Sequence, residues 1–188
     1  MKKSGKRAFG AKKIAFLALT SALALVSFLL ESLLPSLPLP GAKIGLSNVF
    51  TLLPLLFYGT VEALLVVVVK TVLGSLFAGN LSLLLYSLSA GVVSTLCARL
   101  LLYFVPKISI VCVSVVSAVV HNMTQLFVYC LLTKTALLFV YAPHLALLGA
   151  AAGGAVGILV VTLMKTLPLP QAAKNVLFRR ERAQTEVS

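Results

Sequence analysis

The chain has 188 residues, a formal net charge of +12 and a mean hydropathy of +1.09, and 60% of its residues are hydrophobic. A soluble domain of this size keeps much of its surface in water, so this composition excludes an ordinary soluble globular protein. Lipid is the solvent that suits such a surface, and long, continuous apolar runs favour helices over a closed barrel.

The first apolar run follows a basic segment of residues 1–13 and extends from Ile14 to Leu34. A secretory signal is one alternative, with Ala22-Leu23-Ala24 as a small-residue cleavage site. The run continues to Leu34, which is longer than a signal core. A retained first membrane helix is therefore the favoured interpretation.

Six apolar runs, each bounded by charge, Pro, Gly or Asn, predict six transmembrane helices, since a bilayer core takes about 20 apolar residues for each helix. They are Ile14 to Leu34, Gly45 to Tyr58, Val61 to Phe77, Leu81 to Phe104, Ile108 to Leu132 and Pro143 to Lys165. The second is short and contains Pro54, so it is expected to be kinked, tilted or partly re-entrant. The sequence thus predicts an all-α membrane domain over residues 14–166, followed by a basic tail over residues 167–188.

The distribution of Lys and Arg predicts the orientation, because the cytoplasmic side carries the excess. With both termini in the cytoplasm, only Lys43 and Lys134 lie outside and Lys70 lies within the membrane. The other basic residues flank cytoplasmic ends of spans, where they suit an anionic lipid surface. The net charge therefore gives no argument for a nucleic-acid partner. A multi-pass protein of the bacterial cytoplasmic membrane, surrounded by lipid, is expected.

A glycine-containing segment, Pro40 to Asn48, leads into the second span on the outer side and includes Lys43. A flexible loop of this kind can close over a ligand, with Lys43 and Asn48 as polar contacts. Gly79-Asn80 forms the next outer turn, so Asn80 is a further candidate for the same outward-facing pocket. A plain turn between helices is the simpler interpretation of Gly79-Asn80.

Lys70 lies near the middle of the third span, where an isolated ammonium costs about 2.5–3.5 kcal/mol on insertion scales. Something must compensate this charge. Snorkelling to an interface, or pairing with a carbonyl at the broken second helix, is one explanation. The functional alternative is an internal cavity in which Lys70 meets an anionic ligand group.

The fifth span carries His121, Asn122 and Gln125 near mid-membrane. His121 and Gln125 share a helix face, and Asn122 points in a neighbouring direction. Such side chains are costly in lipid unless they are bonded, so they are expected to face inward. They either join helices or bind a ligand, and no catalytic role is expected, because the sequence places no Ser, Cys or carboxylate partner beside His121.

Small residues predict where helices approach one another closely. Gly149, Gly153 and Gly157 form one stripe on the last span, and Ala18 and Ala22 form a weaker pair on the first. Packing inside the bundle is the default interpretation of the glycines, ahead of a partner interface. Cys97, Cys112 and Cys130 have no metal-like spacing, so neither a metal nor another cofactor is expected.

The chain resembles the Gx transporter family, also labelled heptaprenyl diphosphate synthase component I. The resemblance rests on the following motifs in this order: residues 40–48 (PGAKIGLSN), Gly79-Asn80, Tyr86-Ser87-Leu88 and residues 121–125 (HNMTQ). That family is grouped with the substrate-binding S components of energy-coupling-factor transporters. The resemblance implies six helices and an outward-opening pocket under the loop between the first two spans. It also implies that Ala18 and Ala22 contact a transmembrane coupling subunit.

Three functions remain open. The first is an S-component-like binding subunit that takes up a small anionic or amphipathic molecule with an energy-coupling transmembrane subunit and ATPases. The second is a non-catalytic membrane subunit of heptaprenyl diphosphate synthase, working with a soluble synthase partner in the formation of isoprenoid and quinone side chains. The third is a structural membrane protein. The sequence contains no aspartate for Mg²⁺ and diphosphate and no glycine-rich nucleotide loop, so any catalysis would belong to a partner.

Overall fold

The computed structural model describes residues 4–33, 45–105 and 107–166, and every element in these ranges is helical. The helices are α1 (Ser4–Leu33), α2 (Val49–Phe57), α3 (Thr60–Phe77), α4 (Leu81–Phe104), α5 (Ile110–Thr133) and α6 (Ala142–Thr166). Two 3-10 helices, η1 (Leu46–Asn48) and η2 (Ala136–Tyr141), lead into α2 and α6. The predicted all-α bundle of six helices is confirmed. Lys43 and the tail over residues 167–188 lie outside the described residues.

The five long helices are each apolar and long enough to cross a membrane, whereas α2 is too short to do so alone. A 3-10 turn separates α2 from Gly45, which has the left-handed φ of 78°. The second helix therefore begins four residues later than the sequence pattern predicts. α1 begins earlier than predicted, because the basic residues Lys6 to Lys13 continue the helix.

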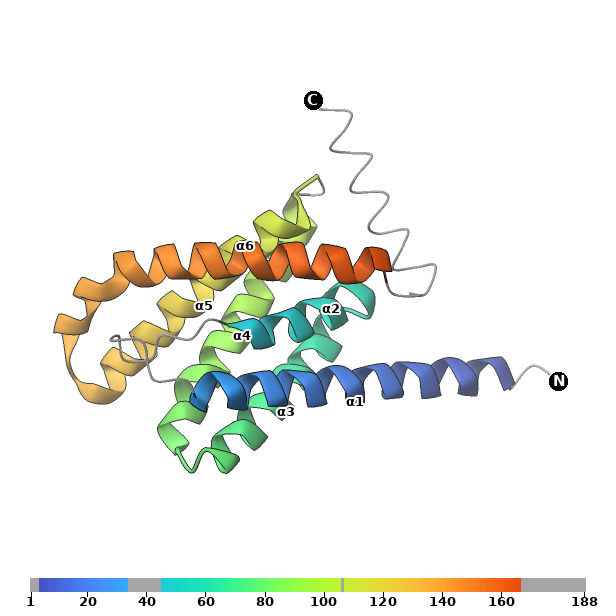
Figure 1. Ribbon diagram of the computed structural model, residues 1–188, viewed down its shortest axis with the longest axis horizontal. Helices are drawn as coiled ribbons and strands as arrows, with labels where there is room; N and C mark the ends of the chain where they lie inside the picture. Colours follow the sequence, from blue (N-terminus) through green and yellow to red (C-terminus); the bar gives the residue numbers. More distant parts are fainter. Residues whose placement is uncertain (1–3, 34–44, 106, 167–188) are drawn as a thin grey trace.

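The short helix lies between two long ones. Figure 1 shows α2 between α1 and α6, and α2 also contacts α3 and α4. The ring of Phe57 at the end of α2 packs against that of Phe16 of α1, with the centroids 5.5 Å apart and the planes tilted by 55°. α1 begins and α6 ends toward the right-hand end of the view. This arrangement places the start of α2, and with it η1, inside the bundle.

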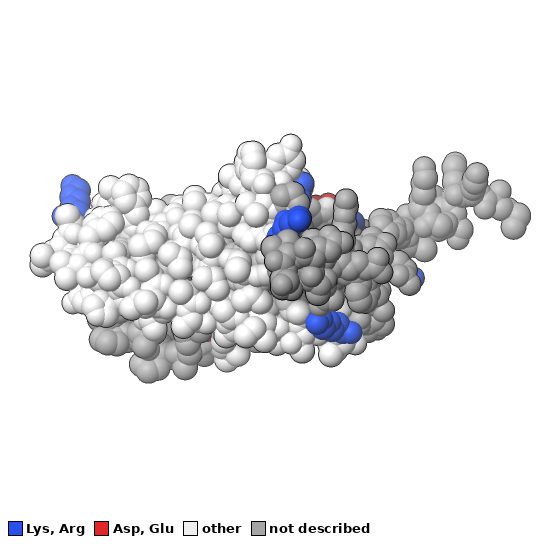
Figure 2. Space-filling model, turned by 90° about the horizontal axis from the view of Figure 1, so that it is seen from above, with Lys and Arg blue, Asp and Glu red and all other residues white. Residues whose placement is uncertain are grey.

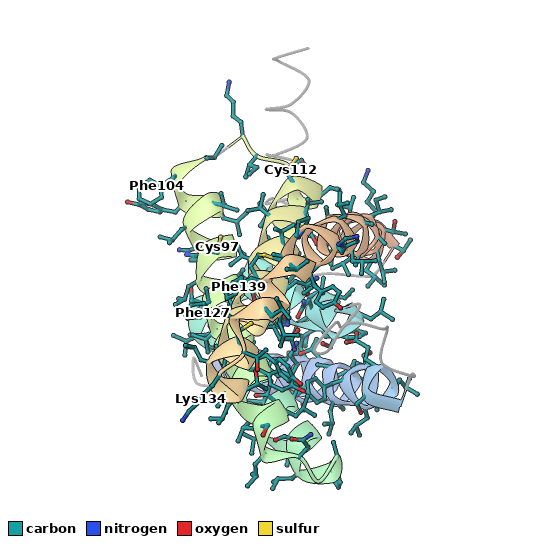
Figure 3. All side chains as sticks on the ribbon, turned by 90° about the vertical axis from the view of Figure 1, so that its left-hand side faces the viewer. Cys97, Phe104, Cys112, Phe127, Lys134 and Phe139 are labelled. Atoms are coloured by element: carbon teal, nitrogen blue, oxygen red, sulfur yellow. The ribbon has the colours of Figure 1, made fainter. Side chains whose placement is uncertain are left out.

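The bundle carries apolar side chains outward and polar side chains inward. Leu, Val and Phe are exposed along every long helix, whereas Thr20, Lys70, Ser87 and Gln125 are buried. Figure 2 shows Lys and Arg side chains at the left-hand end of the molecule and again from about the middle of the view to the right, with a broad uncharged surface between them. Figure 3 shows Lys134 at one end of α5, pointing away from the helices. These features identify a multi-pass membrane protein.

A polar contact near the start of α3 joins it to α1. Lys13 forms an ion pair with Glu62 and lies 5.5 Å from the centre of the Tyr58 ring. Glu62 is in the first turn of α3, where a carboxylate suits the helix dipole. This contact fixes α1 against the α2–α3 connection.

Candidate functional site

The buried ammonium of Lys70 is the centre of the polar interior. Its side chain on α3 is only 2% exposed, and Nζ donates to Ser47 Oγ and to Asn48 Oδ1, both at 3.1 Å. The two acceptors belong to η1, the turn that begins the short second helix. The broken helix therefore supplies polar side chains at the depth of the lysine, and Lys70 does not need to reach a membrane interface.

A carboxylate lies on the other side of the same turn. Glu31 near the end of α1 is 8% exposed, and its Oε1 accepts a hydrogen bond of 3.2 Å from the backbone N–H of Ser47. The two charges thus meet at Ser47, one at its hydroxyl and one at its backbone. Sequence reasoning did not select Glu31 or Ser47. The sequence does contain a signal for Glu31, because this carboxylate lies within an apolar run that is otherwise uncharged.

These charges line a cavity enclosed by α1, η1, α3, α4 and α5. Its empty volume is about 250 Å³, including the part open to the surroundings, and its lining residues are Phe28, Glu31, Gly45, Ser47, Lys70, Thr71, Ser87 and His121. Lys70 and His121 therefore line one cavity, a relation that the sequence could not provide. The enclosed space holds only about one water-sized group, so it suits a single polar group of a ligand rather than a large molecule.

The polar residues of α5 separate into two groups. His121 Nδ1 lies 3.3 Å from Ser94 Oγ on α4, at the cavity wall. Asn122 donates from Nδ2 to the carbonyl of Leu145 at 3.1 Å, so its described contact joins α5 to α6. The structure therefore places Asn122 at a helix interface and His121 at the cavity.

Gln125 and Ser87 are buried polar residues whose side chains find no hydrogen-bond partner among the described residues. Gln125 is 1% exposed and Ser87 is 2% exposed. Within the described part of the chain, neither atom of the Gln125 amide nor the Ser87 hydroxyl has a hydrogen-bond partner. Ser87 lines the cavity, and Gln125 lies one turn beyond His121 on the same face of α5. Unpaired buried polar groups are costly, so these atoms suit a ligand or bound water.

Asn80 lies apart from these residues. Its Oδ1 accepts from the backbone N–H of Leu83 at 3.1 Å and so caps the N-terminus of α4. Gly79, with a φ of 64°, forms the turn before it. The contact described for Asn80 is thus that of an ordinary N-cap.

The small residues fall into two arrangements. Gly149, Gly153 and Gly157 face α5 so closely that an added Cβ would lie within 3.0 Å of an α5 atom at each position. Ala18 and Ala22 are instead exposed on α1, and Ala11 and Ala15 continue the same exposed stripe. The glycines thus lie inside the bundle and the alanines on its surface.

Gly45 holds the turn that presents Asn48 to Lys70. We expect Gly45→Ala to lower the thermal stability more than Gly79→Ala does. Both residues have a left-handed φ, so both variants carry the backbone strain of roughly 1–2 kcal/mol. Only at Gly45 does the added Cβ reach 3.0 Å from the Asn48 amide, whereas nothing lies within 4 Å at Gly79. Thermal unfolding of the two purified variants measures the difference, and equal losses would contradict this role of Gly45.

The fold and the cavity together define a polytopic helical membrane protein with a charged, polar cavity inside its bundle. Residues 20–163 match the family model described as heptaprenyl diphosphate synthase component I, and the chain belongs to that family. The description as component I implies a second component as partner. Comparison with curated proteins and with solved structures gives no match.

Proposed function

We propose that this protein is a non-catalytic binding subunit of the bacterial cytoplasmic membrane, which holds the anionic head group of an amphipathic molecule at Lys70. The observation that carries the proposal is the fully buried ammonium in an intramembrane cavity. Ionisable groups at such depth mark ligand or ion sites more often than they serve packing alone. In line with the family, the ligand is a prenyl diphosphate and the protein serves heptaprenyl diphosphate synthesis.

The cavity offers suitable groups for such a head group. Lys70 supplies a positive charge, and the Ser87 hydroxyl supplies a neutral hydrogen bond. Glu31 in the same wall compensates Lys70 when no ligand is bound. A charge-assisted hydrogen bond to a phosphate oxygen is about twice as strong as a neutral one. The ligand therefore gains most of its polar binding energy from Lys70.

Catalysis is assigned to the partner subunit. Prenyl transfer needs Mg²⁺ held by carboxylates, and the sequence has no aspartate. The part of the chain that the structure describes contains no group of three His, Cys, Asp or Glu residues able to hold a metal ion. In this proposal the membrane subunit binds and presents the amphiphile, and a soluble synthase subunit performs the chemistry.

Uptake of a small molecule is the second candidate function. It is favoured by the exposed alanines of α1, Ala18 and Ala22, which leave a smooth face for a helix of another chain. In this alternative the partner is an energy-coupling transmembrane subunit with its ATPases, and the ligand reaches the cavity from outside. A third alternative is a structural protein in which the polar residues only join helices.

Native mass spectrometry of the protein, extracted gently from its own membrane, tests these alternatives. We expect a bound prenyl diphosphate together with a soluble synthase subunit. A water-soluble ligand with ATPase subunits would instead establish uptake. A chain that carries no ligand, and takes up none when geranyl diphosphate is added, would contradict binding and support the structural alternative.

A further inference from the structure

A histidine lies in the wall of the cavity at Lys70. His121 on α5 is buried and lines the cavity together with Lys70 on α3 and Glu31 on α1. The other elements packed against α5, which are α4, α6 and η2, contribute no titratable side chain to this wall. The charges of Lys70 and Glu31 cancel, so the net charge of the cavity wall depends on whether His121 is protonated.

The hydrogen bonds of Ser94 assign the neutral form of His121. Ser94 Oγ donates to the carbonyl oxygen of Gly91 at 3.2 Å and lies 3.3 Å from His121 Nδ1. A serine hydroxyl has a single hydrogen, so an oxygen that donates to the carbonyl accepts from Nδ1. The neutral imidazole therefore carries its hydrogen on Nδ1 and its lone pair on Nε2, and Nε2 is where a second proton adds.

The two edges of the imidazole ring have different surroundings. His121 lines the cavity at Lys70, whereas Ser94 does not. The Nδ1 edge is thus directed to α4, and Nε2 is the polar atom of the ring that remains for the cavity. The enclosed space holds about one water-sized group, so an anionic oxygen placed there lies close to all three titratable side chains. Such an oxygen is repelled by the lone pair of a neutral Nε2 and accepts a hydrogen bond from a protonated one.

We propose that His121 takes up a proton when an anionic oxygen binds at Lys70, and that its Nε2–H becomes the second cationic contact of the head group. This inference rests on the proposed function and adds its dependence on pH. The proton comes from the solvent and forms the N–H bond at Nε2, so one proton is taken up for each anion bound. Lys70 and the imidazolium then balance Glu31 and the bound anion, and the filled cavity is neutral.

The proposal fixes the direction of the pH dependence. An imidazole has an ordinary pKa of about 6.5 and is mostly neutral above that pH. Binding that requires the imidazolium weakens as the pH rises, because an additional proton must be taken from the solvent. Lys70 stays charged over this range. We therefore expect the affinity for an anion to fall by about tenfold or more between about pH 6 and pH 8.

Calorimetric titration of the full-length protein in detergent with inorganic diphosphate tests this expectation. Titrations at about pH 7.5 in Tris and in HEPES, which differ in their enthalpy of ionisation, count the protons taken up. The wild type is expected to take up about one proton more than His121→Gln, and only the wild type is expected to lose the affinity described above. Protons exchanged by diphosphate itself are common to both proteins. His144→Gln, at the other and exposed histidine of the chain, is the matched control and should behave as the wild type.

The control variant also permits a direct measurement, which does not depend on the folding of His121→Gln. In His144→Gln, His121 is the single histidine of the chain, so NMR of the protein labelled with ¹⁵N-histidine reports the charge of this ring alone. We expect a neutral ring protonated on Nδ1 at about pH 7.5 and an imidazolium after diphosphate is added.

Three outcomes would count against the proposal. A ring that stays neutral while diphosphate binds in a Lys70-dependent manner overturns the role of His121 and leaves the proposed function standing. Proton uptake that is lost in Glu31→Gln and kept in His121→Gln overturns it as well, because the carboxylate is then the group that is protonated. If the wild type binds no diphosphate between about pH 6 and pH 8, the proposed function itself fails.

Discussion

Replacing Lys70 by Met is expected to weaken geranyl diphosphate binding by about tenfold to a hundredfold, the range for loss of a hydrogen bond to a charged group. Met keeps the length and the apolar stem of the side chain but removes the ammonium from the cavity. The affinity for inorganic diphosphate is expected to fall similarly, because the head group makes the lost contact. Calorimetric titration of the variant and the wild type in the same detergent measures both changes.

The same substitution is expected to lower the stability, since Glu31 remains as a buried carboxylate in the cavity wall. Adding Glu31→Gln removes this charge and should restore the melting temperature without restoring binding. Lys107→Met, in the exposed turn between α4 and α5, serves as the control and should change neither property. A single variant that loses stability but keeps full affinity would show that Lys70 only joins helices.

The close approach of α5 and α6 leads to the second large expected effect. An added Cβ at Gly153 would lie 2.7 Å from Val115 Cα and 2.8 Å from the carbonyl oxygen of Ser114. These are backbone atoms, so the helices must move apart. We expect Gly153→Ala to destabilise the protein by about 1–3 kcal/mol, the usual cost of overpacking. Thermal unfolding should show a lower melting temperature, by about 2–4 °C for each kcal/mol.

The adjacent residue provides the control for this prediction. Gly154 is on the same helix, and an added Cβ there meets no atom within 4 Å. Gly154→Ala should therefore be neutral or slightly stabilising, since Ala favours a helix by about 1 kcal/mol over Gly. Equal melting temperatures for the two variants would mean that α5 and α6 do not pack as described.

The long helices could be predicted from the sequence because hydropathy depends on local composition alone. The α4 prediction, Leu81 to Phe104, agrees with the structure at both ends. The second span was less predictable, because its start depends on the left-handed backbone of Gly45 and on the 3-10 turn after it. Hydropathy does not report backbone conformation.

The site was only partly predictable, for a different reason. The free-energy cost of placing a polar side chain in lipid identified Lys70, His121 and Gln125 as residues that need partners. All three are buried. The identity of the partners depends on how α1 and η1 pack against α3, which no local pattern contains. Glu31 therefore went unselected. The sequence places Asn122 and His121 at the same depth in the membrane, so it does not separate their roles. In the structure, the described contact of Asn122 is with the Leu145 carbonyl on α6.

The order of the polar partners along the chain has a consequence for biogenesis. Glu31, Ser47 and Asn48 all precede Lys70, and Ser94 precedes His121. During synthesis the N-terminal part emerges first, so the groups that stabilise the lysine are already made when α3 leaves the ribosome. A helix with a central ammonium is then inserted beside its partners instead of meeting lipid alone. The polar side chains at the start of the broken second helix are thus available as partners before the third helix is inserted.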